Sequence, residues 1–169
     1  MKHVIKVAAA VLIFMTAAGV ARAQSKTAHI NVSELLQAMP EMKAAQAELK
    51  RLEETYRADI QSSMEELRNK FTQYNNEATS MSEEENQKRA LELQGAERNI
   101  GEAQQAAQQE LGKKQAELFE PISQKAKDAI EKVAATQGYQ YVLDSSPGSG
   151  VIVATGKDLL PDVKKALGF

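Results

Sequence analysis

The sequence predicts a mainly α-helical protein with a small β head, in which a long antiparallel helical hairpin projects from a strand-built body. Residues 41–137 are dominated by Ala, Glu, Gln, Lys, Arg and Leu, all of which favour helices. Segments rich in β-forming residues flank this region on both sides. The chain has no cysteine, no Trp, four Phe and four Tyr, so we expect copies to associate in order to bury their apolar surface.

The first 23 residues are predicted to be a cleaved signal peptide. Lys2 and Lys6 precede an apolar run at 7–20, and Ala21-Arg22-Ala23 has the small-x-small pattern of a cleavage site. The run is about 14 residues long, shorter than the roughly 20 that a membrane-spanning helix needs. We therefore expect export and a mature chain at 24–169.

The mature chain is acidic. Three of the 21 basic residues and none of the 23 acidic ones fall in the signal peptide, which leaves 18 basic residues and a formal charge of −5. The hairpin region, with 19 acidic and 14 basic side chains, accounts for all of it. This balance argues against nucleic acid as a partner.

The head is expected to combine residues 24–40 with 138–169. Its first part has an alternating segment at 27–32, a candidate strand, and then a short helix from Ser33 that ends before Pro40. Proline is suited to the first turn of the following helix.

The hairpin, at 41–137, carries apolar stripes with helical spacing. Side chains recurring every three or four residues mark one face of a first long helix: Leu49, Leu52, Tyr56, Ile60, Met64, Leu67, Phe71 and Tyr74. After a polar break, a second stripe follows: Leu93, Ile100, Ala107, Leu111, Leu118, Ile122, Ala126, Ile130 and Val133. At 1.5 Å per residue the two helices are expected to be roughly 55–60 Å and 80–85 Å long.

The second long helix has clear end signals. Ser82 and Glu85 form a predicted capping box at its start, and Gly138 is its predicted stop. Two helices of this length joined by a short turn predict an antiparallel hairpin.

The last part of the chain is expected to form a β-hairpin and a helix. Residues 139–144 and 151–155 are β-rich, and the loop between them contains Pro147, Gly148 and Gly150. A final short helix is predicted at about 158–167.

No motif predicts catalysis or ligand binding. His29 is the one histidine of the mature chain, and no Gly-x-Ser-x-Gly sequence occurs. The segment ending in Gly156-Lys157 differs from a phosphate-binding loop, because Val151 replaces its first glycine and Asp158 its magnesium-binding hydroxyl. Glu83-Glu84-Glu85 is interpreted as complementing a helix N-terminus. We predict a protein that is not an enzyme and uses no cofactor or metal.

Four segments stand in an order and spacing typical of one family: His29-Ile30-Asn31-Val32 with Leu35-Leu36, Met39-Pro40-Glu41, Gly138-Tyr139-Gln140-Tyr141-Val142-Leu143-Asp144, and Asp158-Leu159 with Asp162-Val163 and Leu167. With the signal peptide and the long charged hairpin, they resemble the Skp/OmpH family of periplasmic chaperones over essentially the whole mature chain. Two features differ. Leu160-Pro161 stands where members often have Ser or Thr, and the hairpin is acidic where the best-known members are basic.

The resemblance implies a periplasmic homotrimer that works without ATP. Strands of the three copies would form a small central barrel, and the hairpins would hang from it as tentacles around a cavity that holds unfolded outer-membrane β-barrel proteins. Proximity to a membrane surface stays open. The trimerisation candidates are Ile30, Val32, Tyr141, Val142, Leu143, Val151 and Val153.

Two further sets of residues are candidates for function. Met and aromatic side chains adapt to varied apolar surfaces, so the predicted client contacts are Met42, Met64, Phe71, Tyr74 and Met81. Packing in the seam between the helices is the alternative role, above all for Phe71 and Tyr74. Residues that weaken a helix predict hinges, and these are Gly95, Gly101, Gly112 and Pro121.

Two other functions are weighed against an ATP-independent holdase chaperone. A structural or tethering coiled coil of the envelope would use the same stripes as dimer seams. The stripes, however, wander between spacings of three and four without sustained heptads or matched flanking charges. An enzyme has no supporting motif. The holdase is the leading hypothesis.

Overall fold

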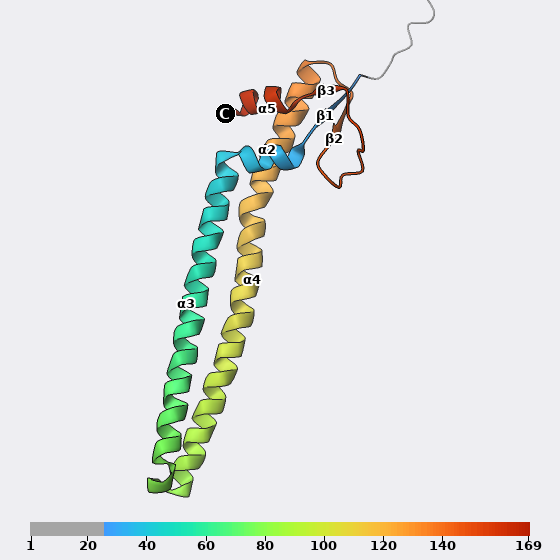
Figure 1. Ribbon diagram of the computed structural model, residues 1–169. Helices are drawn as coiled ribbons and strands as arrows, with labels where there is room; N and C mark the ends of the chain where they lie inside the picture. The colour runs from blue at the N-terminus through green and yellow to red at the C-terminus, as the bar shows by residue number, and fades with distance from the viewer. Residues whose placement is uncertain (1–25) are drawn as a thin grey trace, which may run out of the picture.

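The computed structural model describes residues 26–169, and the predicted signal peptide at 1–23 lies outside this range. The described chain is a long helical hairpin with a small α/β head at one end (Figure 1). The predicted fold class is therefore confirmed. No helix within the described residues has the length and apolar character needed to cross a membrane.

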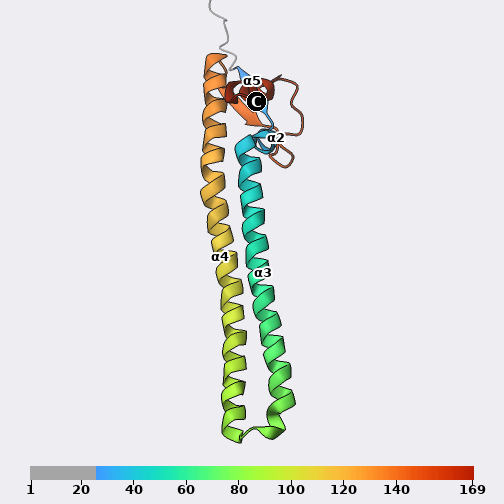
Figure 2. The same ribbon diagram turned by 90° about the vertical axis from the view of Figure 1, so that its left-hand side faces the viewer.

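The hairpin consists of α3 (Pro40–Glu77) and α4 (Glu83–Thr136), which are joined by the short 3-10 turn η2 (Ala78–Ser80). Helices of 38 and 54 residues are about 57 and 81 Å long. They run antiparallel and side by side in both views (Figures 1 and 2). Because α4 is the longer helix, its last turns extend beyond the start of α3 and support the head.

The ends of α4 are set by the residues that the sequence indicated. The Ser82 hydroxyl accepts a hydrogen bond from the Glu85 amide at 3.2 Å, as the capping box requires. At the other end Gly138 has a φ of +71°, the left-handed conformation that favours glycine after a helix. The Lys26 ammonium donates to the Gln137 carbonyl at 2.8 Å and complements the negative end of the helix dipole.

The head contains a three-stranded sheet in the order β2-β1-β3. Its strands are β1 (Thr27–Ile30), β2 (Tyr141–Asp144) and β3 (Lys157–Asp158), and both pairs are parallel. The long hairpin is the crossover that brings β2 back alongside β1. Parallel pairing requires such a long connection.

The β-hairpin predicted from 139–144 and 151–155 is wrong. Residues 151–155 form no strand, and the third strand is Lys157–Asp158. β1 is the central strand and pairs with both β2 and β3. Its Ala28 and Ile30 are buried against the helices. Strand propensity at 151–155 therefore finds no partner within the described chain, because pairing depends on tertiary neighbours more than on propensity.

The core of the head lies where the sheet meets α2 (Val32–Ala38), α5 (Leu160–Leu167) and the last turns of α4. Its most deeply buried large side chains are Ile30, Leu35, Met39, Leu159 and Val163. Each contributes about 1.5–3 kcal/mol by leaving water. The predicted last helix begins two residues later than expected, at Leu160. The Asp158 carboxylate accepts from the Leu160 amide at 2.9 Å, while the N-cap residue Leu159 makes no side-chain capping bond.

A polar cluster around the buried Ser146 hydroxyl joins the end of β2 to the start of α2. The Ser146 hydroxyl lies 2.6 Å from Asp144 Oδ1 and 3.0 Å from Asn31 Oδ1, and it accepts from the Ser33 amide at 3.0 Å. Burial by itself raises the pKa of the Asp144 carboxyl. Hydrogen bonds from the Ser146 hydroxyl, the Ser146 amide and the Val32 amide outweigh burial and hold that pKa below its usual value.

Candidate functional site

The half of the hairpin far from the head, which we define as residues 57–110, exposes large apolar side chains. Phe71 is 54% exposed and Leu91 68%, and Met64 and Met81 are also exposed. Their exposure provides apolar contacts for a partner along a helical rod. Sequence reasoning missed Leu91 because it lies outside the stripe of α4. The sequence did contain a signal for its exposure, because Leu91 is a leucine outside the apolar stripe of a charged helix.

Two of the other predicted contact residues have structural partners. Met42 is buried in the head core. Tyr74 is half-buried, and its hydroxyl donates to the Glu92 carboxylate at 2.8 Å.

Exposed Met64 and Phe71 border a shallow groove on one face of the hairpin. The groove has a volume of about 340 Å³ and is lined by Met64, Leu67, Arg68, Phe71, Glu97 and Ile100. Its apolar side chains come from both helices, so a bound chain would contact α3 and α4 together. Thioether and aromatic surfaces suit partners of variable shape.

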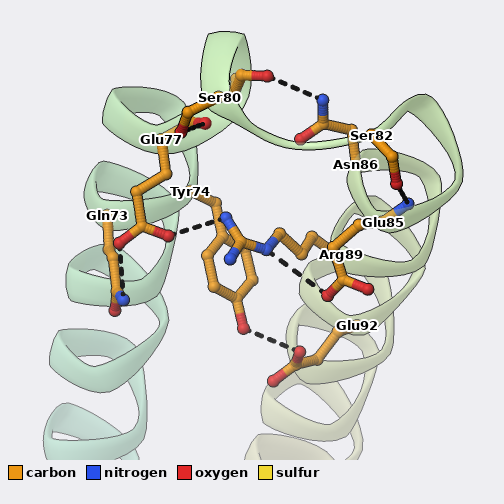
Figure 3. Close-up of polar contacts among 10 residues, drawn as sticks. Gln73, Tyr74, Glu77, Ser80, Ser82, Glu85, Asn86, Arg89 and Glu92 are labelled. Carbon is orange, nitrogen blue, oxygen red and sulfur yellow. Dashed lines mark hydrogen bonds and ion pairs between the residues drawn. The ribbon is translucent and has the colours of Figure 1, made fainter.

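The tip of the hairpin is held by a polar network around Arg89 (Figure 3). The Arg89 side chain is only 15% exposed and lies 2.9 Å from the Glu77 carboxylate and 3.7 Å from that of Glu85. Its guanidinium stacks 4.6 Å from the centre of the Tyr74 ring. Arg89 thus fills a seam position that an apolar residue would normally occupy, and it joins the two helices at the turn.

The carboxylates of this network are stabilised as anions. Hydrogen bonds from Gln73 and then Arg89 lower the pKa of Glu77, and bonds from Tyr74 and then Lys70 lower the pKa of Glu92. The same hydrogen bonds and ion pairs therefore favour the charged carboxylates that link α3 to α4 at the tip.

Four ion pairs cross the seam between α3 and α4, and they fix its register: Glu41–Lys125, Glu48–Lys114, Lys70–Glu92 and Glu77–Arg89. The three pairs other than Glu77–Arg89 are exposed, and each is worth only about 0.2–1 kcal/mol. Their value is in specificity, because a slip of one helix along the other would misalign all four.

The predicted hinge residues all lie within α4. The helix is continuous through Pro121. A Cβ atom added at Gly95, Gly101 or Gly112 would meet no atom within 4 Å outside the adjacent helix backbone. Packing therefore does not require glycine at these three positions.

The head also exposes apolar surface. Ile152 is 97% exposed and Val153 74%, both in the irregular segment after β2, and Tyr141 and Leu143 are exposed on β2 itself. Between the sheet and α4 lies a groove of about 500 Å³ whose lining includes Val32, Val142 and Ile130. Among the other trimerisation candidates, Val151 is half-buried and Ile30 belongs to the core of its own chain.

The residues that could carry chemistry are dispersed. Within residues 26–169 no group of three or more His, Cys, Asp or Glu side chains is arranged to hold a metal ion. His29 Nδ1 lies 3.2 Å from the Ser145 hydroxyl, in the middle of the sheet. The features that stand out are apolar surfaces on a rigid hairpin and on the head.

Comparison with known proteins agrees with this arrangement. Residues 26–167 match the family model of outer membrane proteins described as OmpH-like. The chain is similar to chaperone protein Skp of Vibrio cholerae, with 27% identity over 86% of this chain and 88% of that protein. It is also similar to chaperone protein Skp of Pectobacterium atrosepticum, with 25% identity over 94% of each chain.

A solved structure shows the same fold. It is described as an OmpH-like outer membrane chaperone from Caulobacter crescentus, and it superposes with a TM-score of 0.77 at 19% identity, covering 86% of this chain and 85% of that one. Since the family model spans almost all of the described residues, the protein belongs to the OmpH-like family, whose relatives named above are Skp chaperones.

Proposed function

We propose that this protein is an ATP-independent holdase chaperone that binds unfolded outer-membrane proteins along its helical hairpin. The observation that carries the proposal is that a rod of family-typical fold keeps Met64, Phe71, Met81 and Leu91 exposed in the half far from its head. In a helical hairpin that bound no client, such exposed apolar side chains would lower solubility without making any favourable contact.

Holding would depend on many weak contacts. Each exposed side chain can bury apolar area on a client at about 25 cal/mol per Å². The contacts are spread along the hairpin, so a client can rearrange among them without leaving. No nucleotide is needed, because release follows from the weakness of each contact.

The proposal includes the assembly and location of the protein. Residues 1–23 would be removed on export to the periplasm, residues 24–40 and 138–169 would form the trimerisation body, and residues 41–137 would form the tentacle. Three copies would then enclose a cavity between their tentacles. Exposed Tyr141, Leu143 and Val153 support this assembly, because a lone head leaves them in water.

A tethering role is less well supported, because apolar stripe residues of α3 already pack against α4 within one chain. Leu49, Leu52 and Ile60 lie half-buried at the contact of α3 with α4. A tether would need a second seam at heptad spacing, which the exposed side chains do not provide.

Dilution of a urea-unfolded outer-membrane protein into buffer tests the proposal by light scattering. The mature protein should suppress the scattering, and a Met64→Ser, Phe71→Ser double variant should need several times more protein for the same effect. The control is a Gln61→Ser, Asn69→Ser variant on the same helix, which should act like the parent. Scattering that is unchanged by the parent protein would contradict the holdase function.

A further inference from the structure

A second groove lies in the middle of the hairpin, and we call it the mid-hairpin groove. It has a volume of about 570 Å³, and its apolar floor includes Tyr56, Ile60, Leu67, Ile100, Ala103 and Ala107. The groove with Met64 and Phe71 described above lies on the other face of the seam, and the two share Leu67 and Ile100.

The mid-hairpin groove is open because one of its walls consists of small residues. Tyr56, Ile60 and Leu67 of α3 face Ala96, Ala103 and Ala106 of α4 across it. An alanine covers little of a facing tyrosine, isoleucine or leucine, so apolar surface stays accessible between the helices.

The charged residues that line the groove are three carboxylates, Asp59, Glu66 and Glu110, and one ammonium, Lys70. Asp59 on α3 and Glu110 on α4 line it, and among the described residues neither carboxylate has an ion pair or a side-chain hydrogen bond. A third rim carboxylate, Glu66, shares the Lys70 ammonium with Glu92, at 3.2 and 3.0 Å.

This level of the hairpin is also where cross-seam ion pairing is interrupted. The pair Glu48–Lys114 lies on its head side, and the pair Lys70–Glu92, whose lysine lines the groove, lies at its tip end. Residues 57–110 hold 11 acidic and 6 basic side chains, and the remainder of the mature chain is balanced. The whole charge of −5 therefore lies in the far half of the hairpin. The two helix segments that form the groove, 56–70 and 96–110, hold 6 acidic and 4 basic side chains, a local charge of −2 that attracts cations.

We propose that the mid-hairpin groove selects segments of unfolded clients in which apolar side chains are flanked by lysine or arginine. The inference rests on the proposed holdase function and adds a substrate class to it. Apolar client side chains would enter the groove, and the flanking cations would pair with Asp59 and Glu110. Lysine and arginine suit this geometry because their aliphatic stems also lie along apolar surface.

Charge decides against a second copy of the hairpin as the occupant. Two copies that paired through the same groove would bring the unpaired Asp59 and Glu110 carboxylates of both chains together. Like charges at such a contact repel. A cationic client segment neutralises the same carboxylates.

Peptide binding to the mature full-length protein tests the inference. Three fluorescein-labelled peptides share one apolar centre and are flanked by Lys, Gln or Glu, and anisotropy measures their affinity. At low salt the Lys-flanked peptide should bind about three to ten times more tightly than the Glu-flanked one, as expected for two exposed ion pairs. The difference should shrink in 0.5 M NaCl, where the Debye length is only about 4 Å.

Two variants assign the preference to the groove. The double variant Asp59→Asn, Glu110→Gln should lose most of the preference for the Lys-flanked peptide. The matched control Glu65→Gln, Glu117→Gln removes the same charge outside the groove and should keep that preference. Ala103→Leu, which fills the groove, should weaken all three peptides. Equal binding of the Lys- and Glu-flanked peptides, or an undiminished preference in the groove variant, would overturn the inference.

Three remaining outcomes are distinguishable. If no peptide binds and sedimentation shows hairpins associating with rising concentration, a second copy fills the groove and the inference is overturned. If the parent suppresses client aggregation but shows no charge preference, only the inference fails. If it does not suppress aggregation at all, the holdase function fails as well.

Discussion

Single buried polar groups decide how the two ends of this chain join. The Ser146 hydroxyl contacts Asp144, Asn31 and Ser33, which belong to the end of β2 and the start of α2. These segments are more than 100 residues apart in the sequence. One side chain therefore connects the N-terminal and C-terminal parts of the head. Arg89 does the same at the other end of the molecule, where it joins α3 to α4.

Replacing Ser146 with Ala is expected to destabilise the head by about 1–3 kcal/mol. The substitution leaves the Ser33 amide without its partner and removes the hydroxyl bond to Asp144 Oδ1, which keeps its bonds from the Ser146 and Val32 amides. Chemical denaturation monitored by circular dichroism measures the change. Ser145→Ala is the control and should cost less, because this hydroxyl has only a 3.2 Å contact with His29. Equal losses in the two variants would show that the cluster has no special role.

At the scale of elements, α4 is a long helix that contains residues of low helix propensity. It is one continuous helix of 54 residues, yet it contains three glycines and an internal proline. None of the three glycines is required by a neighbouring atom or by a positive φ. Because packing does not require these helix-weakening residues, we infer that flexibility of the hairpin contributes to its function.

Replacing Gly95, Gly101, Gly112 and Pro121 with Ala should stiffen and stabilise the hairpin. Each glycine change is expected to add about 1 kcal/mol and the proline change about 3 kcal/mol. We expect thermal unfolding to shift upward and the range of client sizes protected from aggregation to narrow.

The control is Gly138→Ala, which should destabilise because its φ is +71°. If the stiffened protein protects small and large clients as well as the parent does, compliance at these four positions has no part in the function.

At the scale of the whole molecule, the head leaves apolar surface that one chain cannot cover. β2 is an edge strand with Tyr141 and Leu143 exposed, and Ile152 and Val153 project from the segment that follows it. Unpaired edges and exposed β-forming segments favour association with other chains. Association through the head would hold the hairpins side by side at one end and leave their far halves free.

A Val153→Asp variant should shift the mature protein from the proposed trimer toward a monomer. Val153 is 74% exposed, so the charge should not disturb the fold of one chain but would be buried at an interface between heads, at a cost that weakens assembly. Sedimentation velocity measures the mass of the parent and the variant. Thr155→Asp, which places the same charge two residues away at another exposed position, is the comparison. A Val153→Asp protein that stays fully trimeric would exclude this segment from the interface.

Local signals in the sequence were enough for the helical elements. The stripes, the Ser82 cap, Pro40 at the start of α3 and Gly138 at the end of α4 all depend on residues within a few positions of each other, and the structure has each of them as expected. The exposed Met64, Phe71 and Met81 could also be singled out, since Met and aromatic residues are rare in a charged helix.

Interactions between distant residues were decided only by the tertiary structure. Residues 151–155 have strong strand propensity, but β1 already pairs with β2 and with Lys157–Asp158. Met42 follows the same apolar pattern as Met64, yet it lies beneath the head and is buried. The fold class and the helix ends are therefore determined by the sequence itself, because capping and amphipathic periodicity act over short distances. Strand partners, the mid-hairpin groove and the exposure of each apolar side chain are decided by which distant segments the hairpin brings together.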